Sequence, residues 1–198
     1  MLIFFRCPAR RSLWMKVTET PLEGLLLIEP RVFHDPRGWF YESYTLKKYA
    51  EKGISSEFVQ DNHSRSCYGT LRGLHFQWDP PMGKLMRVTR GKAFLVAVDI
   101  RKKSKTIGEW VGMEISEDDK TQIWAPAGFA RGFCALSDIV EIQYKCTGTY
   151  NSKCESGILW NDSKIGIKWP IKNPRLSEKD KNAQILDKWL EKEESNNF

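Results

Sequence analysis

Residues 71–77 read LRGLHFQ, a short alternating stretch with one of the chain's three histidines near its middle. Side chains alternate between the two faces of a β-strand, so Gly73, His75 and Gln77 are predicted to share one face. The same alternation places Arg72 on the opposite face. A glycine inside a strand is typical of a bulge, however, and a bulge at Gly73 would turn Arg72 towards His75. The stretch therefore predicts an imidazole on a strand face, with the side taken by Arg72 left open.

Strand-like segments extend on both sides of this stretch, from about residue 25 to residue 169. Glycine and proline separate them at spacings of roughly 8–14 residues. This pattern predicts a mostly β fold, a sandwich or jelly-roll barrel, with a hairpin turning near Arg90 and Gly91. Two helices are expected, a short one within residues 45–53 and one within residues 176–192.

The chain of 198 residues is long enough for one domain with its own core. We expect residues 1–14 to be a disordered extension or to follow a non-native start, residues 15–192 to form the single domain, and residues 193–198 to be a frayed tail. In residues 1–14 the arginines follow a short apolar run, which is not the order of a secretory signal. The sequence contains no run of about 18 apolar residues, so a membrane span is not expected. Five cysteines without CxxC spacing indicate reduced thiols and a cytoplasmic protein.

The formal net charge of +6 includes three arginines within residues 1–14. The remaining excess is small, and no basic run follows one face, so a nucleic-acid partner is not expected. Scattered arginines suit a small anionic substrate at least as well. A nucleic-acid binder would instead show an affinity that falls steeply with salt.

A metal site is not expected either. Metal-binding jelly rolls of the cupin superfamily carry a His-x-His pair and a later histidine after a Pro-x-Gly turn. In this chain the pair reads His75 and Gln77, and the later turn ends in Arg131. His34 and His63 lie in turn-like and polar contexts and do not replace the missing ligands.

The alternative for His75 is a general base. Such a base needs a group that fixes its tautomer, and an enolate formed beside it needs a cation or donor. Lys84 follows nine residues later, and Tyr144 shares a strand face with apolar residues and needs a partner for its hydroxyl. Each residue also has a plainer interpretation: a hydrogen-bonded core histidine, a solvated edge lysine and an ordinary barrel tyrosine.

Eight segments together resemble one family. They are EPRVFHDPRGWFYES (29–43), FVQDNHSRS (58–66), LRGLHFQ (71–77), GKLMRVTRG (83–91), VAVDIRKKSKTIGEWVG (96–112), WAPAGFARGF (124–133), YKCTGTYNSKCESGILWND (144–162) and LSEKD (176–180). In this order and spacing the chain resembles the dTDP-4-dehydrorhamnose 3,5-epimerases over about residues 16–190. The resemblance implies a metal-free, cofactor-independent cupin isomerase. It also implies a homodimer whose substrate is a dTDP-4-keto-6-deoxyhexose, epimerised next to its C4 ketone.

The resemblance also implies roles for residues at matching positions. His75 would be the base, with Asp180 as its carboxylate partner, Tyr144 the acid on the other face and Lys84 the cation at the enolate oxygen. The candidate substrate-binding residues are Arg37, Glu42, Gln60, Asp61, Asn62, Arg72, Arg131, Glu155, Lys179 and, against the thymine, Tyr150. Asp180 has a second interpretation, as an acid in the first turn of a helix capped by Ser177.

One position departs from the family. The family's GFAHGF reads GFARGF here, so Arg131 replaces a histidine and cannot accept a proton near neutral pH. A fixed cation there would favour ionised Asp180 and disfavour an imidazolium at His75. Three functions remain open: a 3,5-epimerase that tolerates Arg131, an epimerase of C3 or C5 alone, and a cupin that binds a nucleotide sugar without turnover.

Overall fold

The structure, a computed structural model, describes residues 14–54 and 57–198. Its strands are β1 (Met15–Glu19), β2 (Leu26–Pro30), β3 (Val32–Asp35), β4 (Gly38–Tyr41), β5 (Gln60–Cys67), β6 (Leu71–Gln77), β7 (Lys84–Arg90), β8 (Lys92–Asp99), β9 (Trp110–Ser116), β10 (Gln122–Ala125), β11 (Phe129–Ala135), β12 (Ile139–Cys146) and β13 (Glu155–Gly157). Its helices are α1 (Leu46–Ala50), α2 (Glu178–Lys181), α3 (Leu186–Leu190) and a 3₁₀ helix, η1 (Glu193–Asn197). The predicted mostly β fold is confirmed.

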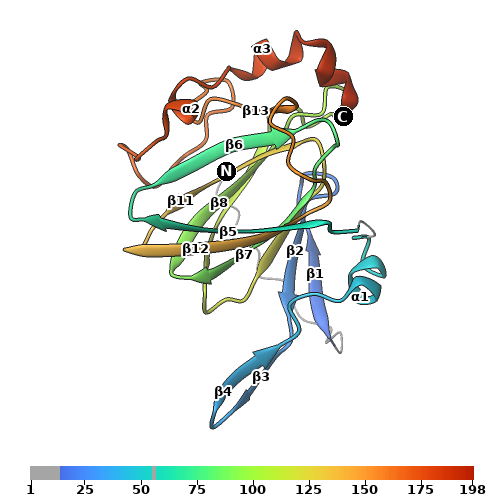
Figure 1. Cartoon of the computed structure of the whole chain (residues 1–198), viewed down its shortest axis with the longest axis vertical. Helices are drawn as coiled ribbons and strands as arrows, with labels where there is room; N and C mark the ends of the chain where they lie inside the picture. Colours follow the sequence, from blue (N-terminus) through green and yellow to red (C-terminus); the bar gives the residue numbers. More distant parts are fainter. Residues whose placement is uncertain (1–13, 55–56) are drawn as a thin grey trace.

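Two antiparallel sheets face each other across the core (Figure 1). The six-stranded sheet has the order β1-β2-β10-β7-β12-β5, and the five-stranded sheet has the order β13-β6-β11-β8-β9. Within the described ranges the sheets do not join into one closed barrel, so the cupin-like fold is a two-layer sandwich. Because β7 and β8 lie in different sheets, the hairpin expected between them is wrong. Gly91, with a φ of +74°, turns the chain from one sheet into the other.

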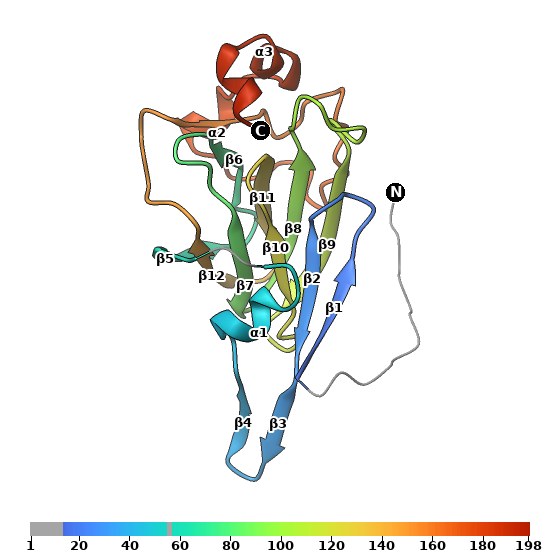
Figure 2. The same cartoon turned by 90° about the vertical axis from the view of Figure 1, so that its right-hand side faces the viewer.

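Three apolar clusters hold these layers together. The largest fills the space between the sheets and includes Ile123 and Phe133. A second lies between the five-stranded sheet and the C-terminal segment, where the rings of Phe76 and Trp189 are 4.5 Å apart. The third lies on the outer face of the six-stranded sheet, which α1 covers in Figure 2, and it includes Tyr49 of that helix. The short helices are thus fixed mainly by the apolar side chains that they contribute to the sheets.

Strand β6 carries a bulge at the glycine of LRGLHFQ. Arg131 pairs with His75 and Phe133 pairs with Arg72, so β6 uses one residue more than β11 over the same length. The extra residue is accommodated at Gly73, which has a φ of +136°. Because Arg131 and Phe133 lie on one face of β11, their partners Arg72 and His75 lie on one face of β6. The bulge at Gly73 therefore turns Arg72 to the same face as His75, and the prediction from strict alternation, which placed them on opposite faces, is wrong.

The C-terminal segment differs from the single helix expected over residues 176–192. Helix α2 ends at Lys181 and α3 begins at Leu186. Between them the backbone carbonyl of Gln184 accepts a hydrogen bond of 2.8 Å from Leu159, so pairing with another segment interrupts the helical ladder. The amphipathic pattern in the sequence could not reveal this long-range backbone contact.

The frayed tail expected for residues 193–198 is also wrong. Ser195 donates a side-chain hydrogen bond of 2.6 Å to the carbonyl of Lys192, and the Phe198 ring lies 6.2 Å from that of Trp189. The extension expected over residues 1–14 falls outside the described residues except for Trp14, and the domain start at residue 15 stays a prediction. Over the described ranges, no helix is long and apolar enough to cross a membrane.

A substitution at Gly73 tests the close approach of β6 and β11. A Cβ at this position would lie 2.5 Å from the Cα of Gly132, whereas a Cβ at Gly38, which has a similar φ of +132°, would meet nothing within 4 Å. Both alanine variants carry backbone strain of about 1–3 kcal/mol. We expect Gly73→Ala to lower the free energy of unfolding by about 1–3 kcal/mol more than Gly38→Ala, the range for overpacking. Urea unfolding at one protein concentration measures both, and equal losses would contradict the steric argument.

Candidate functional site

Side chains from both sheets meet at one end of the space between them. His75 comes from β6 in the five-stranded sheet, and Lys84 and Tyr144 come from β7 and β12 in the six-stranded sheet. Tyr144 lies on the same strand face as the core residue Ile142, and the Nζ of Lys84 lies 4.9 Å from the Tyr144 ring centroid. Lys84 thus comes from the sheet opposite to the one that carries His75.

The base candidate is held by a carboxylate. His75 Nε2 and Asp180 Oδ1 are 2.6 Å apart, and the side chains are 32% and 4% exposed. The Ser177 hydroxyl donates to Asp180 Oδ2 at 2.8 Å, and the Asp180 amide donates to Ser177 Oγ at 3.1 Å. Asp180 therefore makes both contacts that the sequence left as alternatives. It lies in the capped first turn of α2 and bonds His75.

The protonation state of Asp180 follows from these bonds. Burial by itself raises the pKa of this carboxyl, but hydrogen bonding and charge from His75, the Ser177 hydroxyl and the backbone of Gly73 outweigh it. The net result is a pKa below its usual value. An ionised Asp180 can fix the tautomer of His75 and stabilise the imidazolium that forms when His75 takes a proton.

Two cations lie beside the acid candidate. Burial, followed by the charge of Arg131, lowers the pKa of Lys84 to about 8. Arg131 is 4% exposed, and its Nη1 donates to the carbonyls of Met82 at 2.8 Å and Ala125 at 3.3 Å. Burial lowers the pKa of Arg131 to about 10, so it remains charged at neutral pH. The six-stranded side of the site is therefore electropositive.

Tyr144 is the half-buried hydroxyl of the site. Burial raises its pKa, and a hydrogen bond with Asn62 acts in the opposite direction. Asn62 pairs with Tyr144 in the register of β5 and β12, and its side-chain oxygen accepts a hydrogen bond of 3.0 Å from Gln60. A neutral phenol held in this way can donate a proton.

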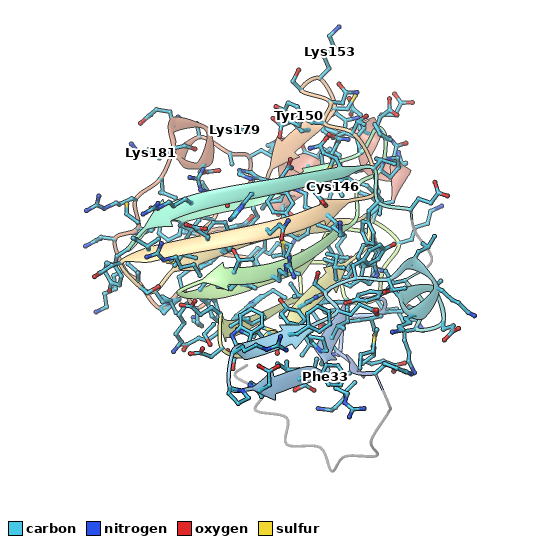
Figure 3. The ribbon with its side chains drawn as sticks, turned by 60° about the horizontal axis from the view of Figure 1, so that its bottom comes forward. Phe33, Cys146, Tyr150, Lys153, Lys179 and Lys181 are labelled. Atoms are coloured by element: carbon cyan, nitrogen blue, oxygen red, sulfur yellow. The ribbon has the colours of Figure 1, made fainter. Side chains whose placement is uncertain are left out.

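A second polar group lies at the mouth of the site. The Tyr150 hydroxyl donates to Glu155 Oε1 at 2.6 Å, and Lys179 Nζ lies 2.5 Å from the same oxygen. Gln60 Oε1 accepts the Tyr150 amide at 2.9 Å, which connects this group to β5. Tyr150 is 59% exposed and presents a ring on which a planar base can stack. Figure 3 shows Tyr150 and Lys179 on the same side of the molecule.

Arg72 completes the outer part of the site. Its guanidinium donates to Ser66 Oγ at 3.1 Å and to the Arg65 carbonyl at 3.3 Å, while the residue itself remains exposed. It therefore spans from β6 to the end of β5, with donors left for a ligand.

Three of the residues predicted for the site are not brought into it. Asp61 lies on the other face of β5 and bonds Lys145 at 3.0 Å. Glu42 pairs with Lys48 at 2.9 Å, and Arg37 pairs with Asp35 at 2.6 Å in the turn between β3 and β4. Figures 1 and 3 show this hairpin, with Phe33, projecting from the end of the molecule opposite to Tyr150.

The structure adds two residues that the sequence reasoning did not place at the site. Cys146 is buried beside Lys84, its register partner on β7, and within electrostatic reach of Arg131. Alternation with Tyr144 on β12 was the available signal for it. The sequence predicts Ser177 only as a helix cap, but its hydroxyl also donates to the carboxylate of Asp180. In the described part of the chain, no group of three or more potential metal ligands lies together.

The lowered pKa of Asp180 predicts a pH dependence of stability. A carboxyl whose pKa is lower in the folded state than in the unfolded chain stabilises the folded state at any pH above its unfolded pKa, near 3.8. This contribution is lost as the pH falls below 3.8. We expect Asp180→Asn to lower the free energy of unfolding at pH 7, with a deficit that shrinks as the pH falls below 3.8 towards the lowered pKa of the folded state. The matched control is Glu178→Gln on the exposed side of the same helix. Urea unfolding between pH 3 and 7 measures both variants, and a deficit independent of pH would contradict the assignment.

The sequence and fold of this chain match those of known proteins. The family model for dTDP-4-dehydrorhamnose 3,5-epimerase matches residues 19–188. A dTDP-4-dehydrorhamnose 3,5-epimerase of Shigella flexneri is 52% identical over 172 residues, which cover 86% of this chain and 95% of that protein. A dTDP-4-dehydrorhamnose 3-epimerase of Streptomyces niveus is 35% identical over 174 residues, covering 87% and 84%.

Solved structures agree with the sequence relatives. The crystal structure of a dTDP-6-deoxy-D-glucose-3,5-epimerase from Legionella pneumophila, in complex with dTDP-4-keto-L-rhamnose, superposes with a TM-score of 0.85 and 46% identity over 87% of this chain and 93% of that one. Fold, length and sequence thus agree over nearly the whole described chain. The chain belongs to the dTDP-4-dehydrorhamnose 3,5-epimerase family of isomerases.

Proposed function

We propose that the chain converts dTDP-4-dehydro-6-deoxy-D-glucose to dTDP-4-dehydro-L-rhamnose, inverting C3 and C5. The observation that carries this proposal is the His75–Asp180 pair on one sheet opposite Lys84 and Tyr144 on the other. A base and an acid on opposite sides of a sugar ring are what inversion requires. The higher identity to the 3,5-epimerase of Shigella flexneri than to the 3-epimerase of Streptomyces niveus favours inversion at both centres.

The proposed reaction uses the acidity of the C–H bonds next to the C4 ketone. His75 takes the proton from C5 or C3, the C–H electron pair forms a C=C bond to C4, and the carbonyl pair moves to the C4 oxygen. Lys84 stabilises that oxygen. Tyr144 then gives its proton to the same carbon from the opposite face, and the C4 carbonyl forms again. His75 loses its extra proton to solvent and Tyr144 regains one, so the site returns to its starting state.

The nucleotide would lie towards the mouth of the site. The free donors of Arg72 suit the diphosphate, since a guanidinium binds phosphate oxygens in a bidentate manner. The exposed Tyr150 ring suits stacking against thymine. Lys179 and Glu155 form an ion pair that the Tyr150 hydroxyl joins, and the charge of Glu155 is felt by His75, so the pair can order the sugar end of the substrate.

The two alternatives both rest on Arg131. An epimerase of one centre, or a cupin that binds the sugar nucleotide without turnover, would follow if the replaced histidine were needed for proton transfer. The intact His75–Asp180 pair argues against the non-catalytic alternative. The carbon that acquires deuterium distinguishes all three functions.

The first test is hydrogen exchange in D₂O with dTDP-4-keto-6-deoxyglucose, followed by NMR. We expect deuterium at both C3 and C5 with the wild-type protein. His75→Asn should lower the exchange rate about 10²- to 10⁴-fold, the usual contribution of a general base. The matched control is His63→Asn, because His63 pairs with Glu141 at 3.2 Å on the other face of β5.

Label at one carbon alone would establish the single-centre alternative. Binding without any label would establish the non-catalytic one. Full exchange in His75→Asn would remove His75 from the role of base, whatever the wild-type product.

We further propose that the protein is a cytoplasmic homodimer in which the β3–β4 hairpin reaches the partner's site. Phe33, Trp39 and Phe40 are 43%, 56% and 71% exposed on this projecting hairpin, an apolar surface of the kind that protein partners cover. Arg37 lies in the turn of this hairpin, which projects from the end of the molecule opposite to Tyr150 in Figure 3, so it would contact a substrate bound to another copy. The four cysteines within the described residues are unbridged, which supports a reducing compartment.

Mixed dimers test this arrangement. Arg37→Ala and His75→Asn are each expected to be impaired as homodimers. Co-expressed with different tags and purified as the hybrid, they should regain activity, since one of the two sites then combines an intact His75 with an intact Arg37. If Arg37 served its own subunit's site, both sites of the hybrid would be defective and no activity would return. Sedimentation analysis of the wild type checks the dimer itself.

A further inference from the structure

Arg131 is a buried cation whose charge is only partly compensated. Its Nη1 bonds two carbonyls, but Nε and Nη2 are buried and have no hydrogen-bond partner among residues 14–54 and 57–198. The described groups that favour its charge are the Cys146 thiol and the Tyr144 hydroxyl, neither of which is a carboxylate. A guanidinium in this state projects its positive charge onto neighbouring groups, because little water or counter-charge screens it.

The neighbour that receives this charge most directly is Lys84. The two carbonyls that fix Nη1 are those of Met82, two residues before Lys84 on the same segment, and of Ala125, the register partner of Lys84 on β10. Arg131 thus crosses from the five-stranded sheet and is anchored at the end of β7 where Lys84 begins that strand. His75, the register partner of Arg131, flanks the same space on β6.

We propose that Arg131 is a positioning residue for enolisation: its buried, uncompensated charge acts through Lys84 and makes that ammonium a stronger proton donor to the C4 oxygen of the substrate. This inference rests on the proposed function. When the C–H pair moves towards C4, the oxygen takes a proton from Lys84 and an enol forms. When Tyr144 protonates the carbon, the enol proton returns to Lys84. No net proton is gained or lost at Lys84 in the cycle.

The other groups around Lys84 do not remove this effect. From β12, Cys146 and the Tyr144 ring face it; from β13, Glu155 favours its charge; and from α2, Lys179 opposes it. Glu155 and Lys179 neutralise each other in an ion pair of 2.5 Å. Arg131 therefore remains the strongest charged influence on Lys84 after burial itself, consistent with a pKa of about 8 for Lys84.

The decisive measurement is an NMR titration of Lys84 in the free protein, with its signal assigned by its loss in Lys84→Gln. We expect Arg131→Met, which keeps much of the side-chain volume without the charge, to raise the titration midpoint of Lys84 by about one pH unit. Arg131→Lys retains a cation and should stay within a few tenths of a unit of the wild type. Because no substrate is present, this readout decides the coupling even if the chain proves not to be an epimerase.

The kinetic readout tests the role. In Arg131→Met we expect kcat at pH 7 to fall about 3- to 10-fold with KM unchanged, because the effect arises as charge develops on the C4 oxygen. We also expect the decline of kcat at high pH to shift to a higher pH. Arg131→Lys, which keeps a cation, should have a kcat close to that of the wild type. An unchanged Lys84 midpoint in Arg131→Met would overturn the proposal. A rise in KM with kcat unchanged would also overturn the proposal, because it would indicate that Arg131 binds the diphosphate of the substrate. Thermal unfolding of both variants identifies a loss that is merely structural.

Discussion

The close approach of two glycines, Gly73 on β6 and Gly132 on β11, is the constraint on which the site depends. A side chain on either would collide with the other strand, and a Cβ at Gly132 would lie 2.8 Å from the carbonyl oxygen of Arg72. The contact admits the bulge that brings Arg72 to the face of His75. At the same point the backbone of Gly73 hydrogen-bonds the carboxylate of Asp180. One strand irregularity thus aligns the base, its carboxylate partner and the arginine nearest to the outer part of the site.

The two-layer architecture separates the two halves of the chemistry. The five-stranded sheet carries His75, and the C-terminal segment packed against it carries Asp180, so the negative charge lies on that side. The six-stranded sheet carries Tyr144 and Lys84, and Arg131 extends across to join them. Acceptors and donors therefore face each other across the space between the sheets. A ketone bound between them would lose a proton to one layer and gain one from the other, which is the geometry of inversion.

The sequence is sufficient for most strands and the short helix, and it names residues such as His75, Lys84 and Tyr144 that the structure brings together, because alternation and ordered motifs are local signals. It is insufficient wherever pairing between distant segments decides the structure. The turn at Gly91 looks the same in a hairpin and in a corner between sheets. The break between α2 and α3 depends on the bond of Gln184 to Leu159. Asp61 is different, because its alternation with Gln60 and Asn62 on β5 places it on the other face, whereas its position within the family motif predicts a substrate contact.

The replacement of the family histidine by Arg131 constrains how two centres can be inverted. Of the three histidines, His34 lies on the projecting hairpin and His63 on the outer face of β5, so His75 is the one imidazole facing the site. Arg131, still charged at neutral pH, cannot act as a second base. Abstraction from both C3 and C5 therefore requires each carbon in turn to present its proton to the same nitrogen. Inversion of both centres by this one imidazole would therefore require the sugar to be repositioned between the two steps.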